Sequence, residues 1–481
     1  MTQPSATQEQ YRQRLARYVT ALRNEQPDAV PIRPFVAEFT AKYAGFTCQE
    51  VTHDYEKAFE AVCRCARDFD WDAVVPNMVY VWTGLTEALD LKYYGVPGID
   101  VPANVAFQYR EPPEEEAFMR ADEYDALIDD PTAFLYTTWL PRVSRVVPAA
   151  GEPATYRGRV ALVKTAWAMG QYFQAFGPQV TRLREECGTA PAIAGILKAP
   201  FDILSDKLRG YVGLTMDMLS QPQKVLRACE ALAPHLFHVA LTTADPNHQA
   251  PVGFWMHRGC VPFVSPQQFE THYWPTLKPV IEELWRRGHQ VLFYAEGNWD
   301  HHLGHFSELP ERSIVFHVDK GDLARARRTL GDKFCLSGGI SNTILSFGTT
   351  DEVLQEAKRV LAEAAKDGAY IADAGAIMQN DTDVENLRIL TDFIREHGVY
   401  PRGHSFPAET QVVPEPDQAR GLKGLTARTS ETKVKPGVCT SWEERARERP
   451  PGDGDADLFR RVWEDIEGLG YSFIWHCLVS F

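Results

Sequence analysis

Several ionisable side chains come directly after apolar runs of the sequence, where a parallel sheet would present them to a ligand. Glu296 follows the run Val291–Tyr294, and Asp373 follows a later run. His317 and Asp319 alternate along a further run, so they share one face of a strand. A carboxylate or imidazole in such a place can act as a general acid or base. We predict that Glu296, His317 and Asp319 are catalytic; the alternatives are a helix-capping carboxylate and a core histidine.

Other polar residues and glycines in similar places could bind a substrate. His257 and Arg258 lie in a segment with aromatic neighbours, which could clamp a carboxylate or stack on a flat ring. An ordinary packed corner is the alternative for this pair. Two glycines after a late strand can expose backbone amides to an anion. The predicted substrate-binding residues are Asp202, His257, Arg258, Asn298, Gly338, Gly339 and Asp373.

A histidine-rich segment follows Glu296 closely. His301 and His305 are four residues apart, which places two imidazoles on one face of a helix, as some metal sites require. Asp300 and His302 add further donors. A histidine-rich surface turn is the simpler interpretation, so we predict no metal ligand in this segment.

Apolar runs alternate with longer helical patterns between residues 33 and 400. This alternation is typical of βαβ units and a parallel sheet. No GxGxxG or Walker A sequence opens a helix, which removes the main support for a nucleotide-binding open sheet. We therefore predict an α/β fold, a (β/α)8 TIM barrel, with its polar groups at the carboxyl ends of the strands. The runs expected as strands are Ala73–Tyr80, Ala192–Ala199, Leu236–Leu241, Val261–Val264, Val291–Tyr294, Ile314–Val318, Phe334–Leu336 and Tyr370–Ala372.

The segments on both sides of this barrel differ from it in character. Residues 1–32 are expected to form an N-terminal helical segment, with an amphipathic helix at about residues 8–23. Residues 401–481 are expected to form an irregular C-terminal extension, because they are rich in Pro, Gly, Thr and charge up to residue 455. A last helix at about Asp455–Leu469 precedes the apolar tail Tyr471–Phe481, which we expect to be buried or to lie in an interface.

Composition excludes several classes of protein. The 481 residues are 44% hydrophobic with a net charge of −15, which argues against nucleic acid or an anionic membrane as the main partner. No run approaches the roughly 18 apolar residues of a membrane span. The start of the sequence lacks a basic segment followed by an apolar stretch. Nine dispersed cysteines indicate reduced thiols, so we expect a cytoplasmic protein.

Short motifs in a fixed order, spanning about residues 35–398, resemble the uroporphyrinogen decarboxylase superfamily. They are Phe69–Ala73, Ala199–Phe201, Leu208–Gly210, Met216–Met218, Val264–Ser265, Phe269, Trp274–Pro275, Glu296–Asn298, Gly338–Ile340, Gly348–Val353 and Glu385–Leu387. The resemblance implies a (β/α)8 enzyme that is either a decarboxylase or a corrinoid-dependent methyltransferase. It also implies a homodimer.

The sequence departs from the decarboxylase pattern of that superfamily. True decarboxylases carry an arginine-rich N-terminal motif, whereas Arg33–Thr40 holds one arginine. They also carry an aspartate after the second strand, and Val75–Tyr80 has none. A porphyrinogen with many carboxylates needs several cations, for which only Arg209 and Arg258 are obvious candidates. Haem biosynthesis is therefore disfavoured.

The zinc ligands of the thiol-methylating relatives are also replaced. Their His-x-Cys motif corresponds to Tyr294–Glu296 here, and their later cysteine falls near Ala374–Gly375. A phenol protonated near pH 7 is a poor ligand, and Glu296 alone is too few donors for zinc. We therefore predict no zinc at this position and an acceptor that is not a thiol. An alcohol, an activated aromatic carbon or a folate nitrogen needs acid–base help instead.

The resemblance and its departures lead to one leading function and two alternatives. The leading function is methyl transfer between a non-thiol small molecule and cobalamin, a corrinoid carried by a separate partner protein that docks at the carboxyl end of the barrel. The first alternative is a decarboxylase or related lyase that acts on a carboxylated substrate. The second is a non-catalytic ligand-binding barrel. Replacing Glu296 by Gln separates them, because a catalyst would lose turnover whereas a binding module would change affinity.

Overall fold

The computed structural model describes residues 5–75, 83–366, 368–405, 435–448 and 454–480. Its strands are β1 Ala73–Val74, β2 Tyr94–Gly95, β3 Gln108–Tyr109, β4 Ala190–Pro191, β5 Gly195–Leu197, β6 Val252–Met256, β7 Val291–Ala295, β8 Ile314–Val318, β9 Cys335–Gly338 and β10 Tyr370–Ile371. Its longer helices are α1 Ala6–Leu22, α4 Tyr55–Asp68, α9 Tyr156–Arg182, α11 Tyr211–Ser220, α12 Pro222–Thr243, α14 Trp274–Arg286, α16 Leu323–Leu330, α18 Thr350–Val360, α19 Val384–His397 and α22 Ala456–Ser480.

Shorter helices fill the connections between these elements. They are α2 Phe39–Ala44, α3 Cys48–His53, α5 Thr83–Leu89, α6 Tyr124–Asp129, α7 Pro131–Phe134, α8 Leu140–Val143, α10 Pro200–Ile203, α13 Pro266–Gln268, α15 Leu303–Phe306, α17 Asn342–Phe347 and α21 Trp442–Glu448.

Parallel strands close into a ring. Six of them form one sheet in the order β10-β9-β8-β7-β6-β5. The consecutive strands β4 and β5 link this sheet to β1, because β4 pairs with β1 while β5 pairs with β6. Ile32 closes the ring: it bridges Ala372 in parallel, and its carbonyl accepts a hydrogen bond from the amide of Asp72 at 3.0 Å. The structure thus confirms the predicted (β/α)8 barrel.

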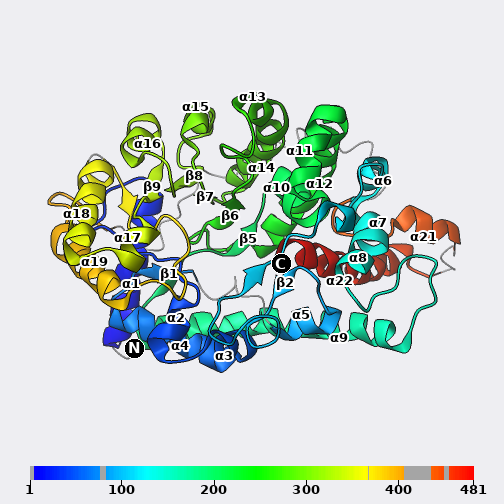
Figure 1. Cartoon of the computed structure of the whole chain (residues 1–481), viewed down its shortest axis with the longest axis horizontal. Helices are drawn as coiled ribbons and strands as arrows, with labels where there is room; N and C mark the ends of the chain where they lie inside the picture. Colours follow the sequence, from blue (N-terminus) through cyan, green and yellow to red (C-terminus); the bar gives the residue numbers. More distant parts are fainter. Residues whose placement is uncertain (1–4, 76–82, 367, 406–434, 449–453, 481) are drawn as a thin grey trace.

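The N-terminal helix α1 lies beside β1 (Figure 1), and its side chains pack against those of the barrel interior. Leu15, Tyr18 and Leu22 belong to the same buried cluster as inward-facing strand residues such as Leu292. The Tyr18 hydroxyl donates to the carbonyl of Ala192 at 2.8 Å. Because α1 starts with a capping box at Ser5, its beginning is also fixed locally.

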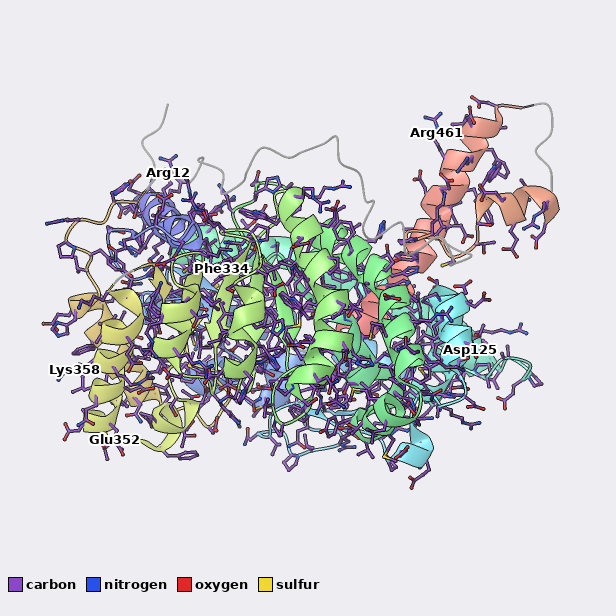
Figure 2. All side chains as sticks on the ribbon, turned by 90° about the horizontal axis from the view of Figure 1, so that it is seen from above. Arg12, Asp125, Phe334, Glu352, Lys358 and Arg461 are labelled. Atoms are coloured by element: carbon purple, nitrogen blue, oxygen red, sulfur yellow. The ribbon has the colours of Figure 1, made fainter. Side chains whose placement is uncertain are left out.

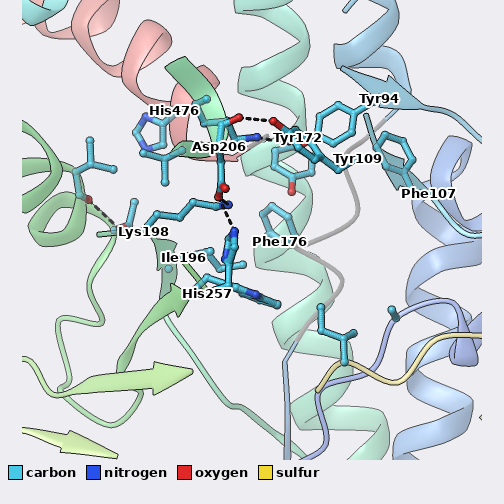
Figure 3. Close-up of a pocket in the computed structure, with 18 of the residues that line it drawn as sticks. Tyr94, Phe107, Tyr109, Tyr172, Phe176, Ile196, Lys198, Asp206, His257 and His476 are labelled. Atoms are coloured by element: carbon cyan, nitrogen blue, oxygen red, sulfur yellow. Dashed lines mark hydrogen bonds and ion pairs between the residues drawn. The ribbon is translucent and has the colours of Figure 1, made fainter. Parts of the chain in front are cut away.

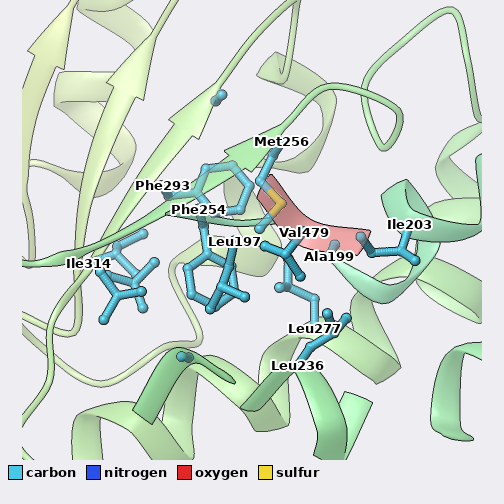
Figure 4. Close-up of a cluster of buried hydrophobic side chains, with 14 of the residues drawn as sticks. Leu197, Ala199, Ile203, Leu236, Phe254, Met256, Leu277, Phe293, Ile314 and Val479 are labelled. Carbon is cyan, nitrogen blue, oxygen red and sulfur yellow. The ribbon is translucent and has the colours of Figure 1, made fainter. Parts of the chain in front are cut away.

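A second apolar layer lies between the strands and the surrounding helices. Alternate residues of the strands, including Leu197, Phe254 and Phe293, face this layer and meet Leu236 of α12 (Figure 4). Val479 of the C-terminal helix α22 belongs to the same cluster (Figure 4). The helix α22 is therefore part of the barrel's helical shell.

The C-terminal helix is longer than the sequence indicated. The predicted helix and apolar tail form the single helix α22, whose second half is buried. The Trp475 ring stacks on His235 with centroids 4.6 Å apart, and its indole N–H donates to Thr132 at 3.1 Å. The first half of α22 and the helix α21 project from the body of the molecule (Figure 2). Residues 406–434 and 449–453 of the predicted extension lie outside the described residues.

Two of the expected strands are wrong. Leu236–Leu241 lies within α12, which is apolar on most sides because the barrel and α22 cover it. Val261–Val264 is a turn, and the strand of this region is β6, which ends before it at Met256. The remaining runs coincide with strands, although residues 76–80 of the first run lie outside the described part of the chain. Within that described part, no helix is both long and apolar enough to cross a membrane.

Candidate active site at the carboxyl end of the barrel

A cavity of about 560 Å³ lies beside the carboxyl ends of β5 and β6. Barrel strands, the hairpin β2–β3, the long helix α9 and the C-terminal helix α22 all contribute to its wall (Figure 3). Its aromatic lining residues are Tyr94, Phe107, Tyr109, Tyr172, Phe173, Phe176 and Trp255. Its ionisable lining residues besides these tyrosines are Glu38, Lys198, Asp206, Lys207, His257, Arg258 and His476. Such a size and lining are typical of a small-molecule site.

Asp206 gathers three cationic or imidazole side chains at one end of the cavity. Its Oδ2 accepts from Lys198 Nζ at 2.6 Å and from His257 Nε2 at 2.7 Å, and its Oδ1 accepts from Arg258 Nε at 2.8 Å (Figure 3). Burial would raise the pKa of Asp206, but His257, Lys198 and Arg258 outweigh it and hold that pKa well below its ordinary value. Asp206 is therefore an anion that holds these side chains in place.

A π-helical segment, Leu204–Arg209, delivers Asp206 and Lys207 to the cavity. The segment continues α10, whose first residue is a proline at the end of β5, and Gly210 with a φ of 76° ends it. The wider turn places two consecutive charged residues on the cavity wall, an arrangement often found at functional sites.

Asp202 lies behind this end of the cavity and orients the loop after β6. Its Oδ1 accepts from the backbone amides of His257 at 3.2 Å and Arg258 at 2.7 Å, and its Oδ2 accepts from the Tyr273 hydroxyl. Burial raises the pKa of Asp202, an effect that His257 opposes. Asp202 therefore positions two predicted substrate-binding residues and does not itself line the cavity.

Asp202, Asp206 and His257 carry donor atoms that lie within 4.8 Å of one another, close enough for a metal ion. The structure uses these donors in other ways. Asp206 neutralises Lys198 and Arg258, and Asp202 is engaged with two amides and a phenol. A divalent cation here would have to displace two positive side chains.

Glu38 is a buried carboxyl on the cavity wall, at the start of α2 and two residues after the bridge between Val36 and Met378. Only 2% of the residue is exposed, and its Oε1 accepts from the amide of Phe107 at 2.9 Å. Burial raises the pKa of Glu38 to about 7, against the pull of that hydrogen bond. A carboxyl with this pKa can give or take a proton at neutral pH.

Glu296 and Asp319, two predicted catalytic residues, lie close together at the ends of β7 and β8. The Glu296 carboxyl is hydrogen-bonded by Trp255, whose side chain lines the cavity, and it lies within the electrostatic influence of His257. Asp319 Oδ2 accepts from the amide of Gly297 at 2.8 Å. Burial raises the pKa of both carboxyls. Glu296 is thus next to the cavity wall, and Asp319 lies behind it.

His317 and Asp373 belong to a buried polar layer inside the barrel. His317 Nε2 donates to Gly375 O at 2.9 Å, so its Nδ1 accepts from the Ser337 hydroxyl at 2.9 Å. Asp373 lies 3.4 Å from Arg33 Nη1, and burial raises its pKa to about 7 although Arg33 opposes this. Burial lowers the pKa of His317 well below its ordinary value, and the charge of Arg33 lowers it further. The His317 imidazole is therefore neutral. Neither residue lines the cavity.

The glycine pair and Asn298 have structural roles in their loops. Gly338 and Gly339 have φ values of 78° and 80°, and a Cβ at Gly338 would come within 2.4 Å of the Val318 carbonyl. The Gly339 amide donates to that same carbonyl, so it does not face an anion. The Asn298 side chain accepts from the amide of Asp300 at 3.0 Å. The structure does not bring these three residues to the cavity.

The segment where we predict no zinc contains a buried tyrosine and a closely packed glycine. The Tyr294 ring is buried and stacks on His317 at 4.0 Å, and Gly375 packs against Asp319. His305 lies 3.4 Å from Glu270 in the outer shell, away from the cavity wall. Tyr294 and Glu296 offer one phenol and one carboxyl at this position, and the absence of zinc there stays a prediction.

Sequence reasoning found His257, Arg258 and the neighbouring Asp202 and Glu296, and it missed four other charged residues. Asp206 follows Asp202 by four residues, a spacing that places two carboxylates on one side of a helix. Lys198 follows β5 directly, but the expected strand ran on to Ala199, and Glu38 follows a segment that makes only isolated bridges and was not expected as a strand. Lys207 carries no comparable signal.

Comparison with known proteins matches residues 144–397, just over half of the chain, to the Uroporphyrinogen decarboxylase (URO-D) family. The uroporphyrinogen decarboxylase of Trichodesmium erythraeum is 24% identical over 224 residues, which cover 44% of this chain and 60% of that protein. The Chlorobium phaeobacteroides uroporphyrinogen decarboxylase is 32% identical over 81 residues, 16% of this chain and 23% of that protein. The chain thus matches less than two thirds of the length of these relatives.

A solved structure with a similar fold is a methyltransferase from Methanosarcina mazei. It superimposes with a TM-score of 0.53 at 15% sequence identity, and the superposition covers 79% of this chain and 97% of that one. At this identity the likeness shows the barrel fold.

Proposed function

Since the chain belongs to the uroporphyrinogen decarboxylase (URO-D) family, we propose that it catalyses methyl transfer between a corrinoid on a partner protein and a small molecule whose reacting atom is not a thiol sulfur. The observation that carries this proposal is the aromatic cavity with Glu38 on its wall. Methyl transfer at an ether or hydroxyl oxygen requires a proton to be given or taken at that oxygen. Glu38, with a pKa of about 7, is suited to do both.

The cavity suits the small molecule and excludes the corrinoid itself. Cavities of this size hold drug-sized ligands, and a corrinoid is far larger. The corrinoid would therefore remain on the partner protein and supply the cobalt that gives or takes the methyl group. The residues of this chain bind the small molecule, exclude water and exchange the proton. The solved structure with a similar fold is named a methyltransferase from Methanosarcina mazei, and this name agrees with the proposed class of reaction.

Three groups of the site have separate tasks in this proposal. The aromatic wall holds the apolar body of the substrate, and Trp255 forms part of that wall. Glu38 exchanges the proton of the reacting oxygen. Asp206 holds Lys198 and His257 at the other end, where they can orient a polar group of the substrate.

Decarboxylation is the second candidate, because the curated relatives are named uroporphyrinogen decarboxylase. A substrate with several carboxylates needs cations that are available to it. Lys198 and Arg258 are neutralised by Asp206, and Arg209 pairs with Asp217 at 2.6 Å away from the cavity wall. The described part of the cavity is therefore better suited to an apolar substrate.

Loss of the methyl–cobalt absorbance of methylcobalamin, with phenols and alcohols as acceptors, tests the proposal. We expect turnover with at least one hydroxyl acceptor and a decrease of about a hundredfold in Glu38→Gln. Turnover of a carboxylated pyrrole, with none of any methyl acceptor, would favour the decarboxylase. The same variant distinguishes a catalyst from a binding protein, because a catalyst would lose turnover in Glu38→Gln while it keeps its fold and its affinity for the substrate.

We further propose that the protein is a cytoplasmic homodimer. All nine cysteines are free thiols, as in reducing compartments.

On the projecting half of α22, four apolar side chains are exposed at helical spacing, and a second subunit could cover them (Figure 2). They are Leu458, Val462, Ile466 and Leu469. Sedimentation at micromolar concentration should give twice the chain mass of 54.2 kDa. A species of one chain mass would contradict the dimer.

A further inference from the structure

Lys207 is a cavity-wall lysine that is enclosed by aromatic rings. Its Nζ lies 4.9 Å from the ring centroid of Tyr93, 5.4 Å from that of Tyr94 and 5.3 Å from that of Tyr109. The residue is 3% exposed and lines the cavity. Nζ donates to the Tyr94 hydroxyl at 3.4 Å. Tyr94 and Tyr109 stand next to each other on this wall (Figure 3).

Lys198, the other lysine among the described lining residues, has a contrasting environment. Lys198 is paired with the Asp206 carboxylate at 2.6 Å. For Lys207, the described residues provide no carboxylate within the 4.0 Å of an ion pair, although Asp206 is its neighbour in sequence. One lysine of the cavity is therefore held as a charged group, and the other is surrounded by groups that cannot neutralise a charge.

These surroundings favour the neutral amine of Lys207. Burial lowers its pKa well below the ordinary value, and the charge of Lys198 lowers it further, whereas Asp206 opposes both. A neutral amine has a free electron pair and is a nucleophile, which an ammonium group is not. Lysines used for covalent catalysis are activated in this way, in apolar pockets beside another cation.

We propose that Lys207 is a nucleophilic lysine that forms an imine with a small aldehyde or ketone bound in the cavity. The inference rests on the position of this amine on the wall of an aromatic cavity, and it is independent of the proposed methyl transfer. The aromatic lining selects a carbonyl compound with an apolar or aromatic body. The size of the cavity admits one such molecule.

The reaction balances with groups of the cavity and solvent. The Nζ electron pair forms a bond to the carbonyl carbon, and the carbonyl oxygen takes a proton to become a hydroxyl. The nitrogen loses a proton to solvent, which gives a carbinolamine. The hydroxyl then takes a second proton and leaves as water while the carbon–nitrogen double bond forms. The product is the protonated imine, which keeps the remaining N–H proton and is the form that cyanoborohydride reduces. Glu38, protonated in part at neutral pH, is the carboxyl on this wall that can donate a proton.

Trapping with benzaldehyde and cyanoborohydride tests the inference on the full chain at pH 7. Cyanoborohydride supplies a hydride that reduces the imine to a stable amine, and peptide mapping then locates the benzyl group. We expect one adduct per chain, on Lys207, at a level at least tenfold above that of exposed lysines such as Lys164. Lys198 serves as an internal comparison and should remain unmodified.

Two variants complete the experiment. Lys207→Arg keeps a cation but cannot form an imine, and Lys207→Met fills the same space with an apolar chain. Both should lose the adduct while the circular dichroism spectrum of the folded protein is kept. Equal labelling of Lys207 and exposed lysines in the wild-type chain would overturn the inference, even if neither variant folds. Since no corrinoid takes part, a failure of methyl transfer leaves this result unchanged.

Discussion

Replacing Glu38 by Gln should make the protein more stable at pH 8 and leave it little changed at pH 5. Burial raises the pKa of Glu38 from 4.5 to about 7, so the folded protein disfavours the ionised carboxyl. Each pKa unit corresponds to about 1.4 kcal/mol of free energy. Ionising Glu38 in the folded protein therefore lowers the free energy of unfolding by about 3 kcal/mol. Protonated Glu38 stabilises the folded protein. This contribution to the free energy of unfolding is complete below pH 4.5 and is lost as the pH rises through 7.

A glutamine at this position has no ionisation to disfavour at high pH, because its side chain carries no titratable group. Its side-chain oxygen can still accept from the amide of Phe107, the hydrogen bond that Glu38 makes at 2.9 Å. The stability of Glu38→Gln relative to the wild type should therefore increase by about 3 kcal/mol between pH 5 and pH 8. At about 2 cal/mol/K per residue, unfolding entropy converts this into roughly 3 °C of melting temperature for a chain of this length.

Thermal unfolding of both proteins from pH 5 to pH 8, at one scan rate, measures this difference. Asp373, whose pKa is also about 7, titrates in both proteins and cancels. Glu311→Gln, at an exposed position, is the matched control and should show no such trend. A difference between Glu38→Gln and the wild type that stays constant with pH would refute the reasoning, and with it the role of Glu38 as a neutral-pH proton donor.

Two further substitutions test the structural account. Asp206→Asn leaves Lys198 and Arg258 without their common anion. Thermal unfolding should show that the free energy of unfolding falls by about 3–5 kcal/mol. The control Asp125→Asn, in a surface ion pair, should lower it by less than about 1 kcal/mol. Equal losses would contradict the role of Asp206. Trp475→Ala should cost about 3–5 kcal/mol, because it removes a buried ring, and the same change at the exposed Trp167 should be nearly neutral. A stable Trp475→Ala would show that α22 does not need its anchor.

The barrel could be predicted because its strands are short apolar runs between helical patterns. The prediction was wrong at Leu236–Leu241, where a helix covered on most sides loses the polar stripe that identifies a surface helix. It missed β6, in which Gly253 weakens the apolar signal. The apolar tail was correctly expected to be buried or to lie in an interface, but its helical form and its place on the cavity wall depend on α12, far away in sequence.

Part of the candidate site could be predicted from local signals. Asp202 and Glu296 were predicted because they follow expected strands, and His257 and Arg258 because they lie among aromatic residues. Lys207 and most of the aromatic wall were not found, because they come from a π-helical segment, a hairpin and the helix α9, and the meeting of these elements is a property of the tertiary structure. His317 satisfied the strand-end pattern, but its partners Ser337 and Gly375 engage both ring nitrogens below the cavity.

The central claim is that this cavity supports methyl transfer between a corrinoid and a non-thiol substrate, and following the methyl group itself tests that claim most directly. Methylcobalamin labelled with carbon-13 in its methyl group is incubated with the protein and a panel of phenols and alcohols, and the label is located by NMR. We expect it on an ether oxygen, with the rate lower by about a hundredfold in Glu38→Gln. Label that stays on cobalt with every acceptor, together with release of carbon dioxide from uroporphyrinogen, would contradict the account.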